Sequence, residues 1–222
     1  MRHAIAIALC LRLLICAPVA QAGAWLEPDG GGFLSSSVRA RPTGGEIGTY
    51  AAYGVTPNLT FGIDINRSED AGFPAAHALV FARLPLRQRD EGWQLALELG
   101  AGVARTGAEW AGMQRVTLSA GRGLDWSAGG GWVSVDLSRE WRQGGAQRAW
   151  KLDGTLGVHR AQGPAPMIQL ELYQPDDGEM IQKLLPALRW QLSESRDLVA
   201  GLEWRSFGDA RLGLKLELWH RF

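Results

Sequence analysis

The sequence predicts an all-β protein: a single antiparallel, up-and-down transmembrane β-barrel of about twelve strands. Three observations lead to this fold class. Apolar and polar residues alternate along most of the chain, glycines fall on the charged face of the predicted strands, and tryptophans gather at strand ends. No stretch of useful length has helical periodicity and no linker or low-complexity segment divides the chain, so we expect one domain after the leader.

Alternation and turn residues define the strands in order along the chain. Each is roughly ten residues long, the length that a tilted strand needs to cross a bilayer. An even number returns the end of the chain to the side where it began, as in single-chain bacterial barrels. Ten strands are an alternative, because the second and fourth segments alternate poorly. The predicted strands are 31–41, 46–55, 58–67, 75–85, 92–104, 112–122, 131–142, 148–159, 166–174, 181–192, 197–206 and 210–222.

The first 22 residues read as a signal peptide. A basic start precedes an apolar run that only Arg12 interrupts, and Ala20-Gln21-Ala22 forms a small-x-small cleavage site. The barrel domain is therefore expected to comprise residues 23–222. A transmembrane anchor is one alternative, although the run is shorter than the roughly 20 residues that span a bilayer. A lipoprotein site at Cys16 is another, although Ile15 stands where a small residue is expected.

Strand alternation alone does not distinguish a membrane barrel from a soluble lipocalin-like barrel. Glycines decide in favour of the membrane, because small residues make room for long charged neighbours on a concave wall. The glycines that share the charged face are Gly62, Gly100, Gly102, Gly121, Gly157, Gly201 and Gly213. We therefore assign the polar face to the lumen and the leucine face to lipid. The charged residues predicted to face the lumen are Arg39, Asp64, Glu98, Arg115, Asp136, Glu140, Lys151, Asp153, Glu171, Arg189, Glu203, Arg205, Lys215 and Glu217.

Tryptophan placement favours the same assignment. Indole prefers the boundary between hydrocarbon and headgroups, so rings of aromatics at strand ends are typical of membrane barrels. Turn-flanking aromatics in the core of a soluble sandwich are the alternative. The tryptophans near strand ends are Trp93, Trp132, Trp141, Trp150, Trp190, Trp204 and Trp219.

The connections are expected to lie alternately at the two ends of the barrel. Thr56–Asn58, 123–130 and 193–196 are predicted on the periplasmic side, and 68–74 and 107–111 on the outer side. The outer loops are short, so little of the protein is expected to project outward.

The last strand resembles the closing strand of Gram-negative outer-membrane barrels. Leu212, Leu214, Leu216, Leu218 and Phe222 share one face of a period-two strand that ends the chain. In such barrels the terminal aromatic strand is the assembly signal, so the resemblance implies that role for Phe222 and makes the barrel assembly machinery a partner. A glycine and an aromatic are common in those strands where Leu218 and His220 stand here.

A second resemblance covers roughly the first third of the mature chain. Ala24-Trp25 with Pro28 and Gly30–Gly32, and then the run from Tyr53 to Gly62, are similar to small, poorly characterised proteobacterial outer-membrane barrel proteins. Their first hairpin often reads Tyr-Gly-Leu-Thr, a turn, then Leu-Thr-Val-Gly. That family has no assigned reaction, so the resemblance implies none for this chain.

Charge and composition exclude several classes of function. Once Arg2 and Arg12 leave with the leader, 21 basic residues face 23 acidic ones, so no basic excess exists to bind nucleic acid. Cys10 and Cys16 also leave, which removes disulfide and thiol chemistry. The histidines of the mature chain, at 77, 159 and 220, are isolated, so no metal site and no cofactor is predicted.

An enzyme is not expected. His159 has Ser134 and Ser138 as candidate neighbours, but no nucleophile elbow is present, and the glycines at 129–131 precede a strand as a turn.

Acidic and basic residues are interspersed on the predicted lumen face. On the last two strands, Glu203 and Arg205 are expected close enough to Lys215 and Glu217 to pair across the ladder. We therefore expect an outer-membrane barrel, exported through the periplasm and surrounded by outer-membrane lipids. Its expected role is passive passage of a small solute or support of an envelope or secretion system. A structural barrel whose lumen is plugged by salt bridges and which acts through partners is the alternative, and a soluble periplasmic β-protein is the third.

Overall fold

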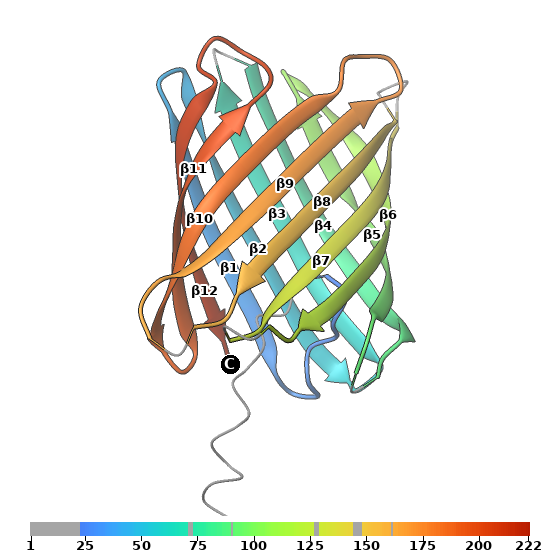
Figure 1. Ribbon diagram of the computed structural model, residues 1–222. Helices are drawn as coiled ribbons and strands as arrows, with labels where there is room; N and C mark the ends of the chain where they lie inside the picture. The colour runs from blue at the N-terminus through green and yellow to red at the C-terminus, as the bar shows by residue number, and fades with distance from the viewer. Residues whose placement is uncertain (1–22, 71–72, 90, 127–128, 144–147, 161) are drawn as a thin grey trace, which may run out of the picture.

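The protein forms a closed barrel of twelve antiparallel strands (Figure 1). The computed structural model describes residues 23–70, 73–89, 91–126, 129–143, 148–160 and 162–222. Each strand pairs with its neighbour in sequence, and β1 pairs with β12 to close the cylinder. The strands are β1 (Gly32–Arg41), β2 (Gly44–Thr56), β3 (Leu59–Asp70), β4 (Phe73–Arg87), β5 (Gln94–Thr106), β6 (Glu109–Leu124), β7 (Gly131–Arg142), β8 (Ala149–Val158), β9 (Ala165–Pro175), β10 (Ile181–Ser193), β11 (Arg196–Arg205) and β12 (Leu212–Arg221).

The prediction of an all-β barrel with twelve strands is confirmed, and the ten-strand alternative is wrong. The poor alternation of the fourth segment has a physical cause. Leu79 and Phe81 face the lumen, where each is 2% exposed, while Val80 between them is 62% exposed. Apolar residues therefore occupy both faces of β4, and a strand pattern based on polarity is blurred there. Gly62 on β3 makes room for the Phe81 ring, which a Cβ at that position would overlap.

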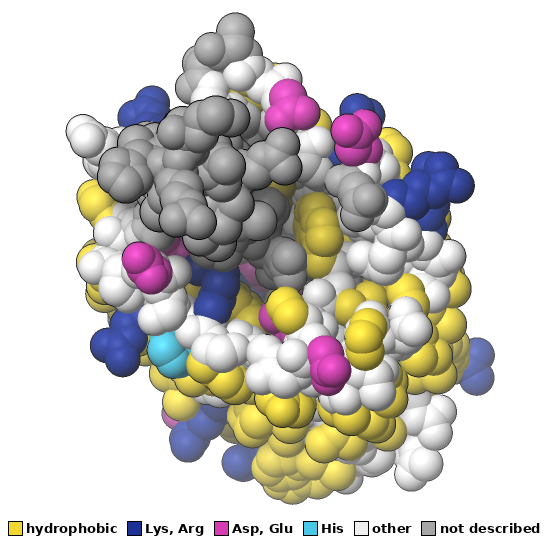
Figure 2. Space-filling model, turned by 90° about the horizontal axis from the view of Figure 1, so that it is seen from below, with side chains coloured by type: hydrophobic (Ala, Val, Ile, Leu, Met, Phe, Trp, Pro, Cys, Tyr) yellow, Lys and Arg dark blue, Asp and Glu magenta, His cyan; other side chains and the backbone are white. Residues whose placement is uncertain are grey.

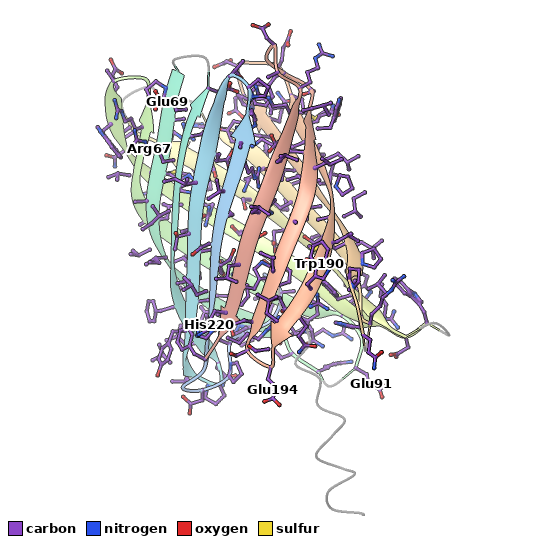
Figure 3. All side chains as sticks on the ribbon, turned by 90° about the vertical axis from the view of Figure 1, so that its left-hand side faces the viewer. Arg67, Glu69, Glu91, Trp190, Glu194 and His220 are labelled. Carbon is purple, nitrogen blue, oxygen red and sulfur yellow. The ribbon has the colours of Figure 1, made fainter. Side chains whose placement is uncertain are left out.

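The outer wall is apolar around the whole circumference. Every strand contributes at least one large hydrophobic side chain that is 38% exposed or more, which a soluble barrel would bury. Figure 3 shows side chains projecting outward from the wall along its height. One such residue from each strand in turn is Val38, Ile47, Ile63, Val80, Leu99, Leu118, Leu137, Leu156, Ile168, Leu188, Leu202 and Leu216.

The inner wall is polar and charged. Eighteen polar or charged residues are buried among the described residues, and they include Arg39, Arg83, Glu98, Arg115 and Glu203. Within each strand they alternate with the exposed apolar residues, as the two-residue period of a strand requires. The alternation that predicted the fold therefore separates an apolar exterior from a charged interior.

The turns alternate between the two ends of the barrel. The C-terminus lies at the lower end in Figure 1, together with the β2–β3, β4–β5, β6–β7, β8–β9 and β10–β11 connections. The opposite end carries the remaining turns, among them the two-residue β5–β6 turn, in which Gly107 adopts a φ of 61°. The predicted grouping of the connections at two ends agrees with this arrangement. The predicted leader, residues 1–22, lies outside the described residues. No helix in the described part of the chain is long and apolar enough to span a bilayer.

Two of the tryptophans predicted at the membrane boundary are elsewhere. Trp132 and Trp219 face the lumen and are only 1% and 8% exposed, so that prediction is wrong for them. Trp132 shares the face of Ser134 and Asp136, and Gly157 on the adjacent strand leaves the space that its indole fills. Others lie on the outside: Trp93, Trp150 and Trp204 are exposed.

Candidate functional site: the polar lumen

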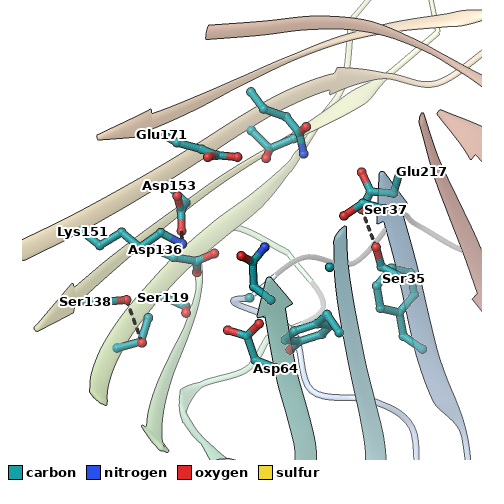
Figure 4. Close-up of a pocket in the computed structure, with 18 of the residues that line it drawn as sticks. Ser35, Ser37, Asp64, Ser119, Asp136, Ser138, Lys151, Asp153, Glu171 and Glu217 are labelled. Carbon is teal, nitrogen blue, oxygen red and sulfur yellow. Dashed lines mark hydrogen bonds and ion pairs between the residues drawn. The ribbon is translucent and has the colours of Figure 1, made fainter. Parts of the chain in front are cut away.

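A cavity of about 310 Å³ lies inside the barrel. Ten of the twelve strands contribute to its wall, all except β10 and β11. The close-up in Figure 4 shows acidic, basic and hydroxyl side chains from different strands pointing into it. Its charged lining consists of seven acids and five bases, namely Glu27, Asp64, Glu98, Asp136, Asp153, Glu171, Glu217, Arg39, Arg83, Arg115, Lys151 and Lys215.

The structure places all the charged residues predicted for the lumen on the inner wall. Most of them line the cavity itself. Glu203 and Arg205, which are 0% and 1% exposed, lie toward the end opposite the termini, and Glu140 is also buried. Arg189 lies at the terminal end, with its guanidinium 4.9 Å from the centre of the Trp132 ring.

Ion pairs cross the lumen at the end away from the termini. The Arg39 guanidinium on β1 contacts Glu171 Oε1 on β9 at 2.5 Å and Glu203 Oε2 on β11 at 3.2 Å. Arg41 joins the same Glu203 at 2.5 Å and Glu46 at 3.1 Å. We call Arg39, Arg41, Glu46, Glu171, Lys183 and Glu203 the ionic cluster. The cluster connects side chains of β1, β2, β9, β10 and β11.

A second set of ion pairs follows the wall from β3 to β6. Arg83 contacts Glu98 at 2.7 Å, and Arg115 contacts both Glu98 at 3.2 Å and Asp64 at 2.7 Å. The Tyr50 hydroxyl accepts a hydrogen bond of 2.5 Å from Arg83. Because each carboxylate receives a charge-assisted hydrogen bond, these charges are compensated inside the barrel.

Sequence reasoning missed several members of these sets. Arg41, Glu46 and Lys183 lie close to the ends of their strands, where the parity of a predicted segment is hardest to assign. Arg83 belongs to β4, whose pattern is blurred by its inward Leu79 and Phe81. Arg83 has the same parity as His77 in this strand, and this shared polar face was the signal for an inward side chain.

The predicted pairing between Glu203–Arg205 and Lys215–Glu217 is wrong. In the register of β11 and β12, Glu203 stands opposite Gly213 and Lys215 stands opposite Gly201, so acid and base are not neighbours. Glu203 instead reaches β1, Arg205 pairs with Asp70 of β3, and Lys215 contacts Glu217 of its own strand at 2.7 Å. The ion pairs therefore cross the lumen more often than the prediction implied.

Aromatic and aliphatic side chains fill the lumen at the terminal end. Trp132, Met167, Ala187, Val199 and Trp219 form a buried cluster, and Trp25 and Phe33 pack against it. We call these seven residues the apolar cluster. In the view from this end in Figure 2, hydrophobic side chains also form much of the outer rim.

Residues 23–27 enter the lumen beside the apolar cluster. Ala24 is fully buried, its carbonyl accepts a hydrogen bond from Gln88, and the carbonyl of Trp25 accepts one from Arg83. The Glu27 amide donates to Thr60 Oγ1 at 3.0 Å. Burial raises the pKa of the Glu27 carboxyl to about 7, although Arg83 and Arg221 act in the opposite direction. We call residues 23–27 the entry segment.

Residues considered for catalysis or metal binding have other contacts. The His159 ring lies 5.1 Å from that of Trp132, and the Ser138 hydroxyl is hydrogen-bonded to Thr117 at 2.8 Å. Among the described residues, no group of three or more histidine, cysteine, aspartate or glutamate side chains is arranged to hold a metal ion.

Several solved barrels share this architecture. The KdgM porin superposes with a TM-score of 0.61 at 8% identity, over 86% of this chain and 99% of the porin. LpxR from Salmonella typhimurium gives 0.55 at 8% identity, over 85% and 99%. The NanC porin gives 0.52 at 10% identity, over 85% and 97%. No protein-family model and no curated protein matches the sequence. At such low identities the likeness establishes the fold, a twelve-stranded barrel of the kind found in outer-membrane porins.

Proposed function

We propose that the protein is an integral outer-membrane barrel that lets small solutes pass slowly through an ion-paired lumen. The membrane location rests on the exposed apolar residues that every strand contributes to the outer wall. The fold shared with porins supports the same location. In this proposal, the leader directs export and outer-membrane lipid covers the hydrophobic wall.

The location is tested by placing the same arginine on the two faces of β12. Leu216 is 56% exposed on the outer wall, and its neighbour Lys215 points into the cavity. Leu216→Arg should cost about 2–4 kcal/mol if the side chain meets hydrocarbon. Lys215→Arg keeps the inward charge and should assemble normally. Heat-modifiable migration of outer-membrane fractions reports assembly, and equal behaviour of the two variants would rule out lipid around this wall.

The observation that carries the transport proposal is the polar cavity inside the barrel. Its five basic residues are each in contact with a carboxylate, so none of the described lining residues offers a free cation to an anionic chain. One KdgM porin structure is a complex with disordered oligogalacturonate. A uronate chain would have to displace the internal carboxylates here. We therefore propose neutral or zwitterionic solutes of small size.

Liposome swelling with sugars and amino acids of graded size measures this passage. Swelling should occur with the smallest neutral solutes, stop at disaccharide size and fall for uronates. Empty liposomes and liposomes that carry heat-denatured protein provide the background. Faster entry of uronates than of neutral sugars of equal size would contradict the proposal.

A closed structural barrel is the second candidate. The ionic and apolar clusters both cross the lumen, and this observation favours a plugged interior that acts through partners at the rim. The absence of swelling with every solute, in a barrel shown to be assembled, would select this candidate. Neither candidate includes a catalysed reaction.

The proposed assembly signal at Phe222 can be separated from the structural role of its backbone. The Phe222 amide and carbonyl both bond to Gly32 of β1, so deletion of the residue would also weaken barrel closure. Phe222→Ala keeps those bonds and removes only the ring, which is exposed. If the assembly machinery reads the ring, Phe222→Ala should accumulate unassembled in the periplasm, whereas Phe222→Tyr should assemble. Normal assembly of Phe222→Ala would refute the signal.

A further inference from the structure

Asp136 on β7 is a buried carboxylate without a cationic partner. It forms no ion pair among the described residues, and its Oδ1 atom is buried without a hydrogen bond. A carboxylate in this condition is costly, because it has lost water and gained no compensating charge. A positively charged group next to Asp136 would compensate this carboxylate.

A second acid on the neighbouring strand β8 makes the negative charge of Asp136 more costly. Asp136 stands directly opposite Asp153 of β8, so two acids occupy facing positions of one ladder. Like charges placed directly opposite each other destabilise a sheet. Asp153 is compensated by Lys151, whose Nζ lies 2.7 Å from its Oδ2, and Figure 4 shows this pair beside Asp136. Asp136 is the member of the pair for which the described residues supply no cation.

Gly23, the first residue of the entry segment, lies against the Asp136 carboxylate. A Cβ built on Gly23 would lie only 2.6 Å from the Asp136 Cγ, so the backbone of Gly23 is in direct contact with the acid. The segment is fixed there by the hydrogen bonds of Ala24, Trp25 and Glu27. The Gly23 nitrogen is an amide as long as the leader is attached. Cleavage after Ala22 would turn it into a primary ammonium group at the same place.

We propose that Asp136 binds the α-ammonium group of Gly23 once the leader is removed, and thereby fastens the entry segment inside the lumen. The inference rests on the proposed cleavage after Ala22 and is independent of solute passage. Removal of the leader would create a cation beside Asp136, where the described part of the chain supplies none. An α-amino group ionises with a pKa of about 7.7–8.0 in peptides, so it is largely charged at neutral pH. Position 23 suits glycine, because a side chain there would collide with Asp136.

The other charges that act on this position come from several strands. Asp136 interacts electrostatically with Arg83 on β4, Glu98 on β5 and Asp153 on β8. Its charge also affects Tyr50 on β2. Arg83 already contacts Glu98 at 2.7 Å, and Lys151 already contacts Asp153. The two nearby bases are therefore engaged with other acids, which leaves the Gly23 ammonium group for Asp136.

Two measurements on the assembled, processed protein test the proposal. Intact mass should first show a chain that begins at Gly23, and any other start would overturn the inference. The amine is then reductively dimethylated with ¹³C-formaldehyde and a borohydride reductant, which keeps its charge, and its pKa is followed by NMR. We expect a value at least about 1 unit above that of the same protein unfolded, because a neighbouring carboxylate favours the charged form.

Asp136→Asn should abolish this shift, whereas the matched variant Asp153→Asn should keep most of it. Asp136→Glu serves if the asparagine variant fails to assemble, and it should retain an upward shift. An amine that titrates alike in folded and unfolded protein would overturn the proposal, as would an unchanged shift in Asp136→Asn. Binding of a small cation at Asp136 with a normally titrating amine is another contradicting outcome. Conductance enters none of these readouts, so failure here is distinguishable from failure of the transport proposal.

Discussion

At the end of the barrel that carries the termini, the lumen is filled by aromatic and aliphatic side chains; at the opposite end it is crossed by arginine–carboxylate pairs. The two fillings respond to perturbation in different ways. The apolar cluster depends on shape, so a smaller side chain leaves a void. The ionic cluster depends on balanced charge, so the loss of one arginine leaves its three carboxylates with only two cations. The comparison suggests that ion permeation is controlled at the ionic end.

Removal of one arginine from the ionic cluster should have the largest effect. Arg39→Ser leaves Glu171 and Glu203 without their shared partner and should destabilise the barrel by about 3–5 kcal/mol. It should also raise conductance and shift it toward cations. Arg67→Ser is the control, because Arg67 and its partner Glu69 are largely exposed and 3.7 Å apart. Urea unfolding of the two variants measures the difference, and equal midpoints would remove the distinction between buried and exposed pairs.

A void in the apolar cluster should have a somewhat smaller effect on stability. Trp132→Ala should cost about 3 kcal/mol, the low end for such a change, because the adjoining cavity lets neighbours relax. Ion selectivity should stay unchanged, since no charge is removed. Trp110→Ala, on the exposed face, provides the matched control. A shift in selectivity as large as that of Arg39→Ser would contradict the assignment of selectivity to the ionic end.

A change of pH should loosen the entry segment at the apolar end. The pKa of Glu27 is about 7 in the folded protein against about 4.5 in an unfolded chain, so the folded state favours the neutral acid. Stabilisation of the segment is therefore complete below pH 4.5 and is lost as pH rises through 7, by about 3 kcal/mol at most. Hydrogen exchange of the peptide 23–32, corrected for the intrinsic rate, should show less protection at pH 8 than at pH 5. Glu27→Gln should remove this dependence; a dependence that persists in this variant would assign it to another group.

The strand pattern predicted the barrel because period two survives on most strands, and β12 shows it most clearly, with Leu214, Leu216 and Leu218 all exposed. The pattern does not tell which partner each inward charge chooses. Glu203 illustrates the reason: the β11–β12 register places Gly213 opposite it, and its actual partners lie more than 160 residues away on β1. Register and closure determine such pairs.

The apolar end was the least predictable region. Trp132 and Trp219 follow the same end-of-strand rule as exposed tryptophans, and only their parity with Asp136 and Glu217 distinguishes them. The entry segment has no periodicity, so its insertion into the lumen left no pattern in the sequence. Gly157 and Gly121 mark the spaces for Trp132 and Trp25, which is a signal visible only after the strands are paired.

Single-channel recording in planar bilayers tests the central claim, that solutes pass slowly through a lumen whose charges are paired. The unmodified barrel should show a small conductance with weak ion selectivity, because paired charges present little net field to a passing ion. Arg39→Ser should increase the conductance and make it cation-selective. A large, strongly selective conductance in the unmodified protein would contradict the claim, and so would no conductance at all in a barrel that is shown to be inserted.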